Sequence, residues 1–261
     1  LWRTSLMNRF ENGSSPLSGG PVLMIIAIML CSVLSAGISV FATPAAGELD
    51  NTPSFAGAKA AGDWIKAGES DSSGSLGGTP LTTTSHTDSS GNTYLTGFLL
   101  GDVKFGSISE SGEQDAYIAK IDSSGNWQMV KKAGQYGGGG FSWGNDVVTD
   151  SSGNIFITGF YAGNISFGNS QLRSTTDSNG DDSVDIFVAK MSSSGNWLWA
   201  KSAGGSYDGD AGNGVASDGN GGAYVVGAFN ISGTWGANGY GTNGYGDAFI
   251  AHITSTGAWD W

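Results

Sequence analysis

The sequence has one cysteine, Cys31, and two histidines, His86 and His252, among 261 residues. Cys31 lies in an apolar N-terminal stretch, so the remainder of the chain has no disulfide and must be held together by packing. With roughly 200 residues, that remainder is long enough to bury a sufficient core. Neither histidine belongs to a metal-site spacing, and no Gly-x-Ser-x-Gly motif provides a serine nucleophile. These absences argue against covalent catalysis.

Basic residues and prolines are also scarce. Eleven Lys and Arg stand against 23 Asp and Glu, which gives a formal net charge of −12. Such a charge repels phosphate backbones, so we expect no nucleic-acid partner. Glycine, by contrast, is abundant at 45 residues, with only 5 prolines and no Gly-X-Y period. This composition excludes collagen and predicts that the glycines serve turns.

One long hydrophobic segment is present near the N-terminus. Val22 to Ala42 contains no charged residue and follows Arg3 and Arg9. Its length matches the roughly 20 residues that span a bilayer as a helix. Its small residues at Val40 and Ala42 also suit the end of a secretory signal peptide. A cleaved signal and a retained membrane anchor therefore both remain open, and both place the rest of the chain outside the cell.

This reading divides the chain into four parts. We expect a cytoplasmic N-terminal region at 1–21, a hydrophobic helix at 22–42, a linker at 43–54 and a repetitive domain at 55–261. The only expected contact with a membrane is through the hydrophobic helix. The expected location of the repetitive domain is extracellular or on the cell surface.

The repetitive domain contains three copies of one pattern, Asp88 to Trp127, Asp150 to Trp197 and Asp218 to Trp259. In the second copy, the run from Ile155 to Tyr161 is rich in β-branched and aromatic residues, with Ile155, Ile157 and Gly159 alternating with Phe156, Thr158 and Phe160. This period of two predicts a strand. Polar segments such as Asp150-Ser-Ser-Gly-Asn154 fit short hairpin turns. We predict four antiparallel strands in this copy, at 146–149, 155–161, 186–191 and 197–202.

Four short strands per copy at near-even spacing are typical of β-propeller blades. The run Asp150-Ser-Ser-Gly-Asn-Ile-Phe-Ile-Thr-Gly159, with Asp185-Ile-Phe-Val-Ala-Lys190 and Ser194-Gly-Asn-Trp197, resembles the β-propeller repeats called SBBP. The resemblance implies an all-β fold of four-stranded antiparallel blades in a surface or secreted protein, without shared catalytic residues. The third copy departs from the pattern at Gly222 and His252. The expected blades span 81–133, 143–203 and 212–261.

The ends of the repetitive domain suggest an incomplete ring. Phe55 to Gly62 aligns with Trp197 to Gly204, so a lone outer strand is expected at 55–61. Trp259-Asp260-Trp261 begins another such strand. Because propellers close with roughly four to eight blades, we expect the three blades to form an open arc within a longer protein.

Candidate site residues lie in the connections between predicted strands. Asp177, Asn179, Asp181 and Asp185 place oxygen ligands at alternate positions, as at the start of a calcium loop, but the later positions of such a loop are missing. No other cofactor is expected. Aromatic residues in glycine-rich loops are candidates for ligand binding, and sequons are candidates for glycosylation. The aromatic candidates are Tyr136, Trp143, Tyr240 and Tyr245, and the sequons begin at Asn164 and Asn230.

A further recurring feature is an aromatic-glycine pair after the second strand of each copy, at Phe105-Gly106, Phe167-Gly168 and Trp235-Gly236. We expect this aromatic residue to pack on the neighbouring sheet. For function we expect a scaffold that binds protein or glycan through its loops, without catalysis. Two alternatives remain open, a purely structural surface-layer or stalk component, and a propeller lyase or glycoside hydrolase using groups such as Asp146 and His86.

Overall fold

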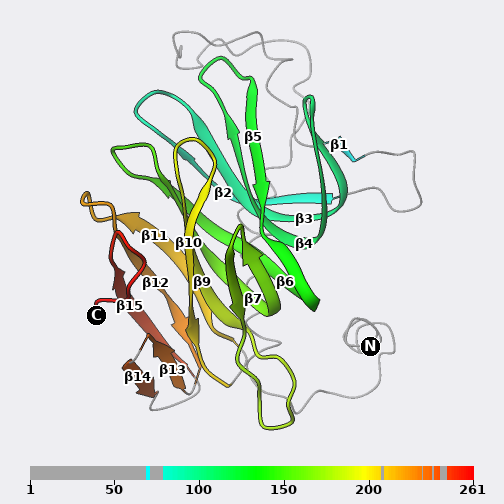
Figure 1. The fold of residues 1–261 in the computed structure, drawn as a ribbon. Helices are drawn as coiled ribbons and strands as arrows, with labels where there is room; N and C mark the ends of the chain where they lie inside the picture. Colours follow the sequence, from blue (N-terminus) through cyan, green and yellow to red (C-terminus); the bar gives the residue numbers. More distant parts are fainter. Residues whose placement is uncertain (1–68, 71–78, 207–208, 231, 237, 242–245) are drawn as a thin grey trace, which may run out of the picture. The chain divides into compact units, whose positions relative to one another are not determined.

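The computed structural model describes residues 69–70, 79–206, 209–230, 232–236, 238–241 and 246–261. All of them belong to one compact unit, Thr43–Trp261. The predicted helix at 22–42 and the predicted strand at 55–61 lie outside the described residues. Every regular element in the described part is a β-strand, and every strand pair is antiparallel (Figure 1). The all-β, antiparallel part of the expectation is therefore confirmed.

Each copy of the sequence pattern forms its own open meander of strands. The first repeat comprises β2 (Thr79–Thr87), β3 (Thr93–Phe105), β4 (Ile108–Ile121) and β5 (Trp127–Lys132). The second repeat comprises β6 (Gly134–Thr149), β7 (Ile155–Phe167), β9 (Asp185–Met191) and β10 (Trp197–Gly204). The third repeat comprises β11 (Ala211–Ser217), β12 (Ala223–Phe229) and β15 (Asp247–Ile253).

The connections between the second and third strands are more ordered than the sequence predicted. In the second repeat, β8 (Ser170–Arg173) folds back on β7 as a hairpin. In the third repeat, β13 (Ser232–Trp235) and β14 (Asn238–Gly241) form a hairpin that pairs with β10 of the second repeat. A short strand, β1 (Glu69–Ser70), pairs with β3. These hairpins satisfy backbone groups that a long loop would leave exposed.

Aspartates begin most of the tight turns, as the turn motif predicted. In the turn from β6 to β7, Asp150 Oδ1 accepts hydrogen bonds of 2.9 Å from the backbone N–H groups of Ser152 and Asn154. Gly153 then takes a positive φ of 76°, which glycine tolerates without a steric penalty. The same aspartate geometry recurs in four other turns, at Asp88, Asp122, Asp177 and Asp218. These local bonds fix the hairpin registers.

A glycine near the middle of the second strand permits a bulge in the first strand of each repeat. The register shifts by one residue at Thr83, Asn145 and Asn213. A Cβ atom on the facing glycine of β3, β7 or β12 would overlap a backbone carbonyl oxygen of the first strand. The recurring glycine is therefore a requirement of the bulge. The three glycines are Gly97, Gly159 and Gly227.

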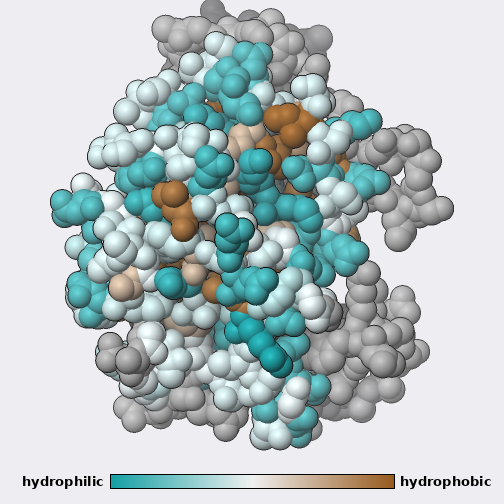
Figure 2. Space-filling model, viewed as in Figure 1, coloured by the Kyte–Doolittle hydropathy of each residue, from teal (hydrophilic) through white to brown (hydrophobic). Residues whose placement is uncertain are grey.

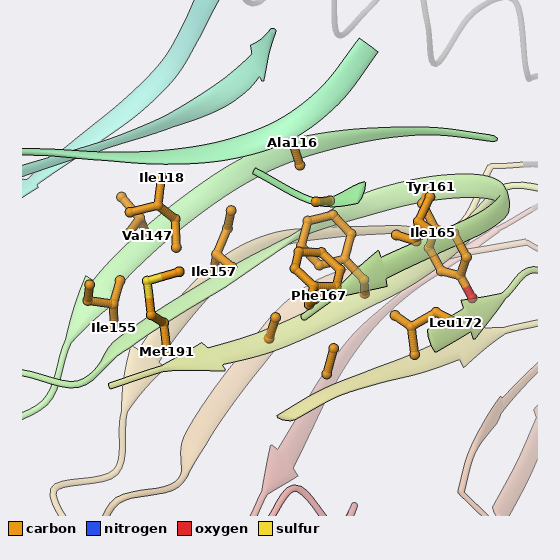
Figure 3. Packing of buried hydrophobic residues seen from close by; sticks show 14 of the residues in the cluster. Ala116, Ile118, Val147, Ile155, Ile157, Tyr161, Ile165, Phe167, Leu172 and Met191 are labelled. Carbon is orange, nitrogen blue, oxygen red and sulfur yellow. The ribbon is translucent and has the colours of Figure 1, made fainter. Parts of the chain in front are cut away.

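The sheets pack face to face through apolar side chains. Between the first and second repeats, Ile118 of β4 and Ile157 of β7 belong to one buried cluster, which extends to Phe167 and Leu172 (Figure 3). Between the second and third repeats, Phe156 and Val188 belong to a cluster with the third repeat. Alternate residues of β7 therefore face different neighbours, so β7 is buried on both sides. A third cluster covers the other face of the first repeat.

In the first two repeats the recurring aromatic residue contacts the tryptophan of its own sheet, a contact that the sequence did not predict, while Phe167 also belongs to the buried cluster shared with the first repeat, as expected. Phe105 meets Trp127 edge to face with ring centroids 5.0 Å apart. Gly106 has a φ of 62°, and its ideal Cβ position lies 3.1 Å from Trp127. The hairpin end therefore folds onto the aromatic residue that begins the fourth strand. Strands β5 and β10 do begin at Trp127 and Trp197, as predicted.

Hydrophilic and neutral residues dominate the molecular face drawn in Figure 2, with separate small hydrophobic patches. No helix of the described residues is long and apolar enough to cross a membrane. The candidate membrane segment at 22–42 lies outside those residues.

Candidate functional site

Four half-buried aromatic side chains gather where the first and second repeats meet. Phe98 comes from β3, Phe141 and Trp143 come from β6, and Phe160 comes from β7. We call these four residues the aromatic patch. β6 is the end strand of its sheet, so Phe141 and Trp143 lie on an edge strand.

Trp143 is the centre of the aromatic patch. Its ring centroid lies 4.3 Å from that of Phe98 and 5.9 Å from that of Phe160, and the second pair is stacked at 22°. Phe141 meets Phe160 edge to face, with centroids 6.3 Å apart. Ring pairs at these separations stabilise one another beyond their buried area. The patch is therefore a preorganised aromatic surface whose rings are each partly open to solvent.

The backbone geometry of β3, β6 and β7 brings these rings together. Phe98 and Phe160 follow Gly97 and Gly159, the glycines that face the bulges of β2 and β6. Trp143 is the Cα partner of Phe160 across the β6–β7 pair. The bulge just after Trp143 increases the local twist of the edge strand. The Gly-Phe pair in both repeats was a sequence signal for this site, although Trp143 was the one member of the patch predicted from the sequence.

Polar groups near the aromatic patch already have partners in the fold. Ser142 Oγ accepts a hydrogen bond of 2.9 Å from the backbone N–H of Ala116 in the first repeat. Asn145 Nδ2 donates a bond of 2.9 Å to the carbonyl oxygen of Gly212 in the third repeat. These bonds hold neighbouring sheets together. The chemistry that the patch offers a ligand is therefore mainly apolar and aromatic.

A buried carboxylate, Asp115, lies one residue before Ala116. Its Oδ2 atom forms an ion pair of 2.6 Å with Lys132 Nζ and accepts a bond of 3.1 Å from the backbone N–H of Glu113. Gln135 Nε2 donates to Oδ1 over 3.4 Å. This network joins β4, β5 and β6 and has the character of a structural ion pair.

The residues considered for the enzyme alternative serve structural roles. Asp146 accepts bonds of 2.9 Å from the backbone N–H groups of Val147 and Val215, the second of which lies in the third repeat. Burial raises the pKa of Asp146 above its ordinary range, although both hydrogen bonds oppose this shift. His86 Nε2 lies 3.0 Å from Thr149 Oγ1 and connects the first and second repeats.

The four residues of the predicted calcium loop occupy two different settings. Asp177 Oδ1 accepts bonds from the backbone N–H groups of Asn179 and Asp181, which makes Asp177 a turn-capping residue. The hydrogen bond from Asp181 N–H is the largest cause that lowers the pKa of Asp177. Asp185 is instead buried and accepts from Thr175 N–H at 2.8 Å. Within the described ranges, no three His, Cys, Asp or Glu side chains form a group that could hold a metal ion.

The remaining predicted site residues are dispersed. Tyr136 is half-buried and lies in β6, so the stretch from Tyr136 to Trp143 is strand where the sequence analysis expected a loop. Tyr240 is exposed on β14. Tyr245 lies outside the described residues. The structure therefore brings neither Tyr136 nor Tyr240 into ring contact with Trp143.

The two sequon asparagines differ in exposure. Asn164 is half-buried in β7, where it pairs with Arg173 of β8. Asn230 is buried, and its backbone N–H donates a bond of 2.7 Å to Asp210 Oδ1. Because a glycan needs a solvent-exposed asparagine, Asn230 is a poor acceptor in this fold. Asn164 stays a predicted acceptor.

No protein-family model and no curated protein matches this sequence.

Proposed function

We propose that this chain is an exported, non-enzymatic binding scaffold that holds a protein partner on the aromatic patch. The observation that carries this proposal is the cluster of Phe98, Phe141, Trp143 and Phe160, partly open to solvent on an edge strand. Aromatic anchors of this kind contribute most of the binding energy at protein interfaces. A glycan is a weaker candidate, because the nearest polar groups, Ser142 and Asn145, are engaged within the fold.

We propose in addition that the three repeats are β-propeller blades of the SBBP type. Three features support this. Each repeat is an antiparallel meander with its first strand at an end of the order, the sheets pack face to face in sequence, and the first strands β2, β6 and β11 contact one another in turn. A radial stack of blades has this arrangement of neighbours.

Export through the segment at 22–42 completes the proposal, because its length and lack of charge suit a signal peptide or an anchor. The domain then acts outside the cell. Calcium at Asp177, Asn179, Asp181 and Asp185 is not needed for the proposed binding. The exported location is tested by protease treatment of intact cells, and protection of residues after 46 would contradict it.

The binding proposal is tested with a phage-displayed random peptide library selected on the full chain. Enriched peptides should contain aromatic or aliphatic anchors. Trp143→Ser should weaken them at least about 30-fold, which corresponds to about 2 kcal/mol for an interface hot spot. Tyr240→Ser is the matched control, since Tyr240 is an exposed aromatic residue outside the patch. Equal binding to both variants, with unchanged circular dichroism, would refute the proposed site. Selective binding of a glycan array to wild type over Trp143→Ser would favour a glycan instead.

A further inference from the structure

The third repeat exposes, position by position, the surface that the first two repeats use to bind the repeat that follows them. On β3 and β7, Tyr94 and Phe156 are 2% and 0% exposed and belong to the clusters shared with the next sheet. The equivalent residue on β12, Tyr224, is 39% exposed. On β4 and β9, Ile118 and Val188 are fully buried, whereas the equivalent Ile250 on β15 is 59% exposed.

The same relationship holds for the fourth strand. Met129 and Trp199 lie two residues into β5 and β10, and both approach a glycine in a turn of the next repeat. An ideal Cβ on Gly195 would be 2.6 Å from Met129 Sδ, and one on Gly257 would be 2.9 Å from Trp199. The equivalent residue of the third repeat is Trp261, which is 53% exposed.

A polar contact marks the same surface. The bulge residue Thr83 donates through Oγ1 to the carbonyl oxygen of Gly144 in the next repeat. The bulge residue Asn145 donates through Nδ2 to the carbonyl oxygen of Gly212, again in the next repeat. The third bulge residue, Asn213, carries a side-chain amide and is exposed. An equivalent hydrogen-bond donor is therefore exposed on the third repeat.

One edge of β15 belongs to this surface. β15 pairs with β12 from Asp247 to Ile253, and no other named strand pairs with it; its C-terminal end is bonded by the bridge from Ile253 to Trp259 and by a bond of 2.8 Å from His252 N–H to Trp261 O. In the first two repeats, β5 and β10 cover the corresponding edge. A hollow of about 520 Å³ lies beside β15, lined in part by Ile250, Ala251 and Trp261.

We infer that the outer face of the third repeat, defined by Asn213, Tyr224, Val226, Ile250 and Trp261, is a docking surface for a further blade of the same repeat. This inference rests on the proposed blade arrangement. The surface continues the pattern of two interfaces already present in the chain, which use the equivalent residues. An open apolar sheet face that ends in an edge strand is a strong site for sheet-to-sheet association.

The glycines of the two existing interfaces define what the docking blade must contain. A Cβ on Gly144 would overlap Thr96 Oγ1 of the preceding repeat, and a Cβ on Gly212 would overlap Thr158 Oγ1. The docking blade therefore needs glycine at this position of its first strand, opposite Val226. The first repeat of a second copy has Thr82 there, immediately before its bulge. Head-to-tail docking of a second copy is disfavoured for this steric reason.

The inference is tested by lengthening the full chain. A second copy of residues 200–261 is fused after Trp261, so that the new Ala200 continues the strand as it does after Trp199. In a Cys31→Ser background, Ile250→Cys in the original third repeat reports access to a maleimide. We expect the appended unit to slow labelling of this thiol at least roughly tenfold, because a buried side chain reacts only through local opening. Leu198→Cys, at an exposed site away from the docking face, should keep its rate.

Two variants make the test specific. Gly212→Val in the appended unit alone should restore fast labelling, because the added side chain meets Val226. Asn213→Ala in the original third repeat, which leaves the core intact, should raise the labelling rate of the lengthened chain. Circular dichroism reports folding of every variant.

Three outcomes would overturn the inference. One is labelling of Ile250→Cys that is equally fast with and without the appended unit. Another is slow labelling of Ile250→Cys in the lengthened chain that neither Gly212→Val nor Asn213→Ala changes. That result would indicate that the appended unit shields the thiol without specific docking. The third is slow labelling in the unlengthened chain together with a dimer in sedimentation that Ile250→Lys dissociates, which would assign the surface to a second copy. None of these readouts involves the aromatic patch, so failure here is separate from failure of the proposed binding site.

Discussion

Phe167 and Trp197 meet edge to face, with ring centroids 4.8 Å apart and ring planes at 73°. Phe167 ends β7, Trp197 begins β10, and β8 and β9 lie between them in the chain. The contact closes the hairpin end of the second repeat onto its fourth strand. The pair from Phe105 to Trp127 repeats it in the first repeat. This aromatic contact is therefore a structural unit of the repeat.

The first prediction concerns that contact. Phe167 is fully buried, so Phe167→Ala should lower the free energy of unfolding by about 3 to 5 kcal/mol through lost burial and a residual cavity. Leu198→Ala, at a side chain 52% exposed next to Trp197, should change it by less than about 0.5 kcal/mol. Denaturant unfolding of both variants measures the difference. Similar losses in the two would mean that the aromatic contact is not specific.

The bulge glycine of β7 gives a second prediction. A Cβ at Gly159 would overlap the carbonyl oxygen of Trp143, so Gly159→Ala should destabilise the fold by about 1 to 3 kcal/mol. Gly239→Ala is the control, because its Cβ would lie 3.9 Å from Thr234 Cγ2, an ordinary contact. Thermal unfolding compares the two. A neutral Gly159→Ala would show that β6 does not need its bulge.

A third prediction concerns the buried pair of Lys190 and Asp150. Lys190 Nζ lies 3.6 Å from Asp150 Oδ2, donates a bond of 2.6 Å to Gly221 O, and sits 4.8 Å from the ring centroid of Phe156. Asp150→Ala leaves the ammonium group buried without its counter-ion, and should cost about 3 to 5 kcal/mol.

The double variant Asp150→Ala with Lys190→Met is the control for this pair. It should recover part of the loss, because no buried charge is then left without a partner. Denaturant unfolding of the two single variants and the double variant gives the coupling. Strict additivity of the two changes would contradict a direct interaction.

The third repeat replaces this lysine by His252, which leads to a pH prediction. His252 Nε2 lies 3.0 Å from Asp218 Oδ2, and Nδ1 lies 3.0 Å from Asp260 Oδ2. The hydrogen bond with Asp218 is the main cause that raises the pKa of His252 above its ordinary 6.5. A raised pKa stabilises the folded state fully below pH 6.5, and this contribution is lost as pH rises through the raised pKa.

We therefore expect the melting temperature to fall as pH rises above 6.5, through loss of this contribution. His252→Lys is the matched variant, since Lys120 and Lys190 occupy the equivalent positions and lysine titrates only near about pH 10.4. It should remove the fall in this pH range. A wild-type profile identical to that of His252→Lys would show that His252 does not contribute.

Much of each repeat could be predicted from the sequence, because its determinants are local. The alternation over Ile155 to Tyr161 and the turn from Asp150 to Asn154 depend on side chains that bond within a few residues. The Asp-x-x-Gly-Asn turns therefore predicted the hairpins, and the strands start at the expected tryptophans. The stretch from Tyr136 to Trp143 was wrongly expected to be a loop, because its glycines hid a strand that pairs with β7.

The strand order within each repeat follows from local sequence, since period-two alternation and aspartate turns act over short distances. The choice of rings that meet at the aromatic patch depends on how the sheets pack, because Phe98 and Trp143 belong to different sheets. The packing of the sheets also determines which faces are buried. Tyr94 and Tyr224 occupy the same place in the pattern, yet the first is covered by the next repeat and the second is open. Burial depends on the neighbouring sheet, which a local pattern does not specify.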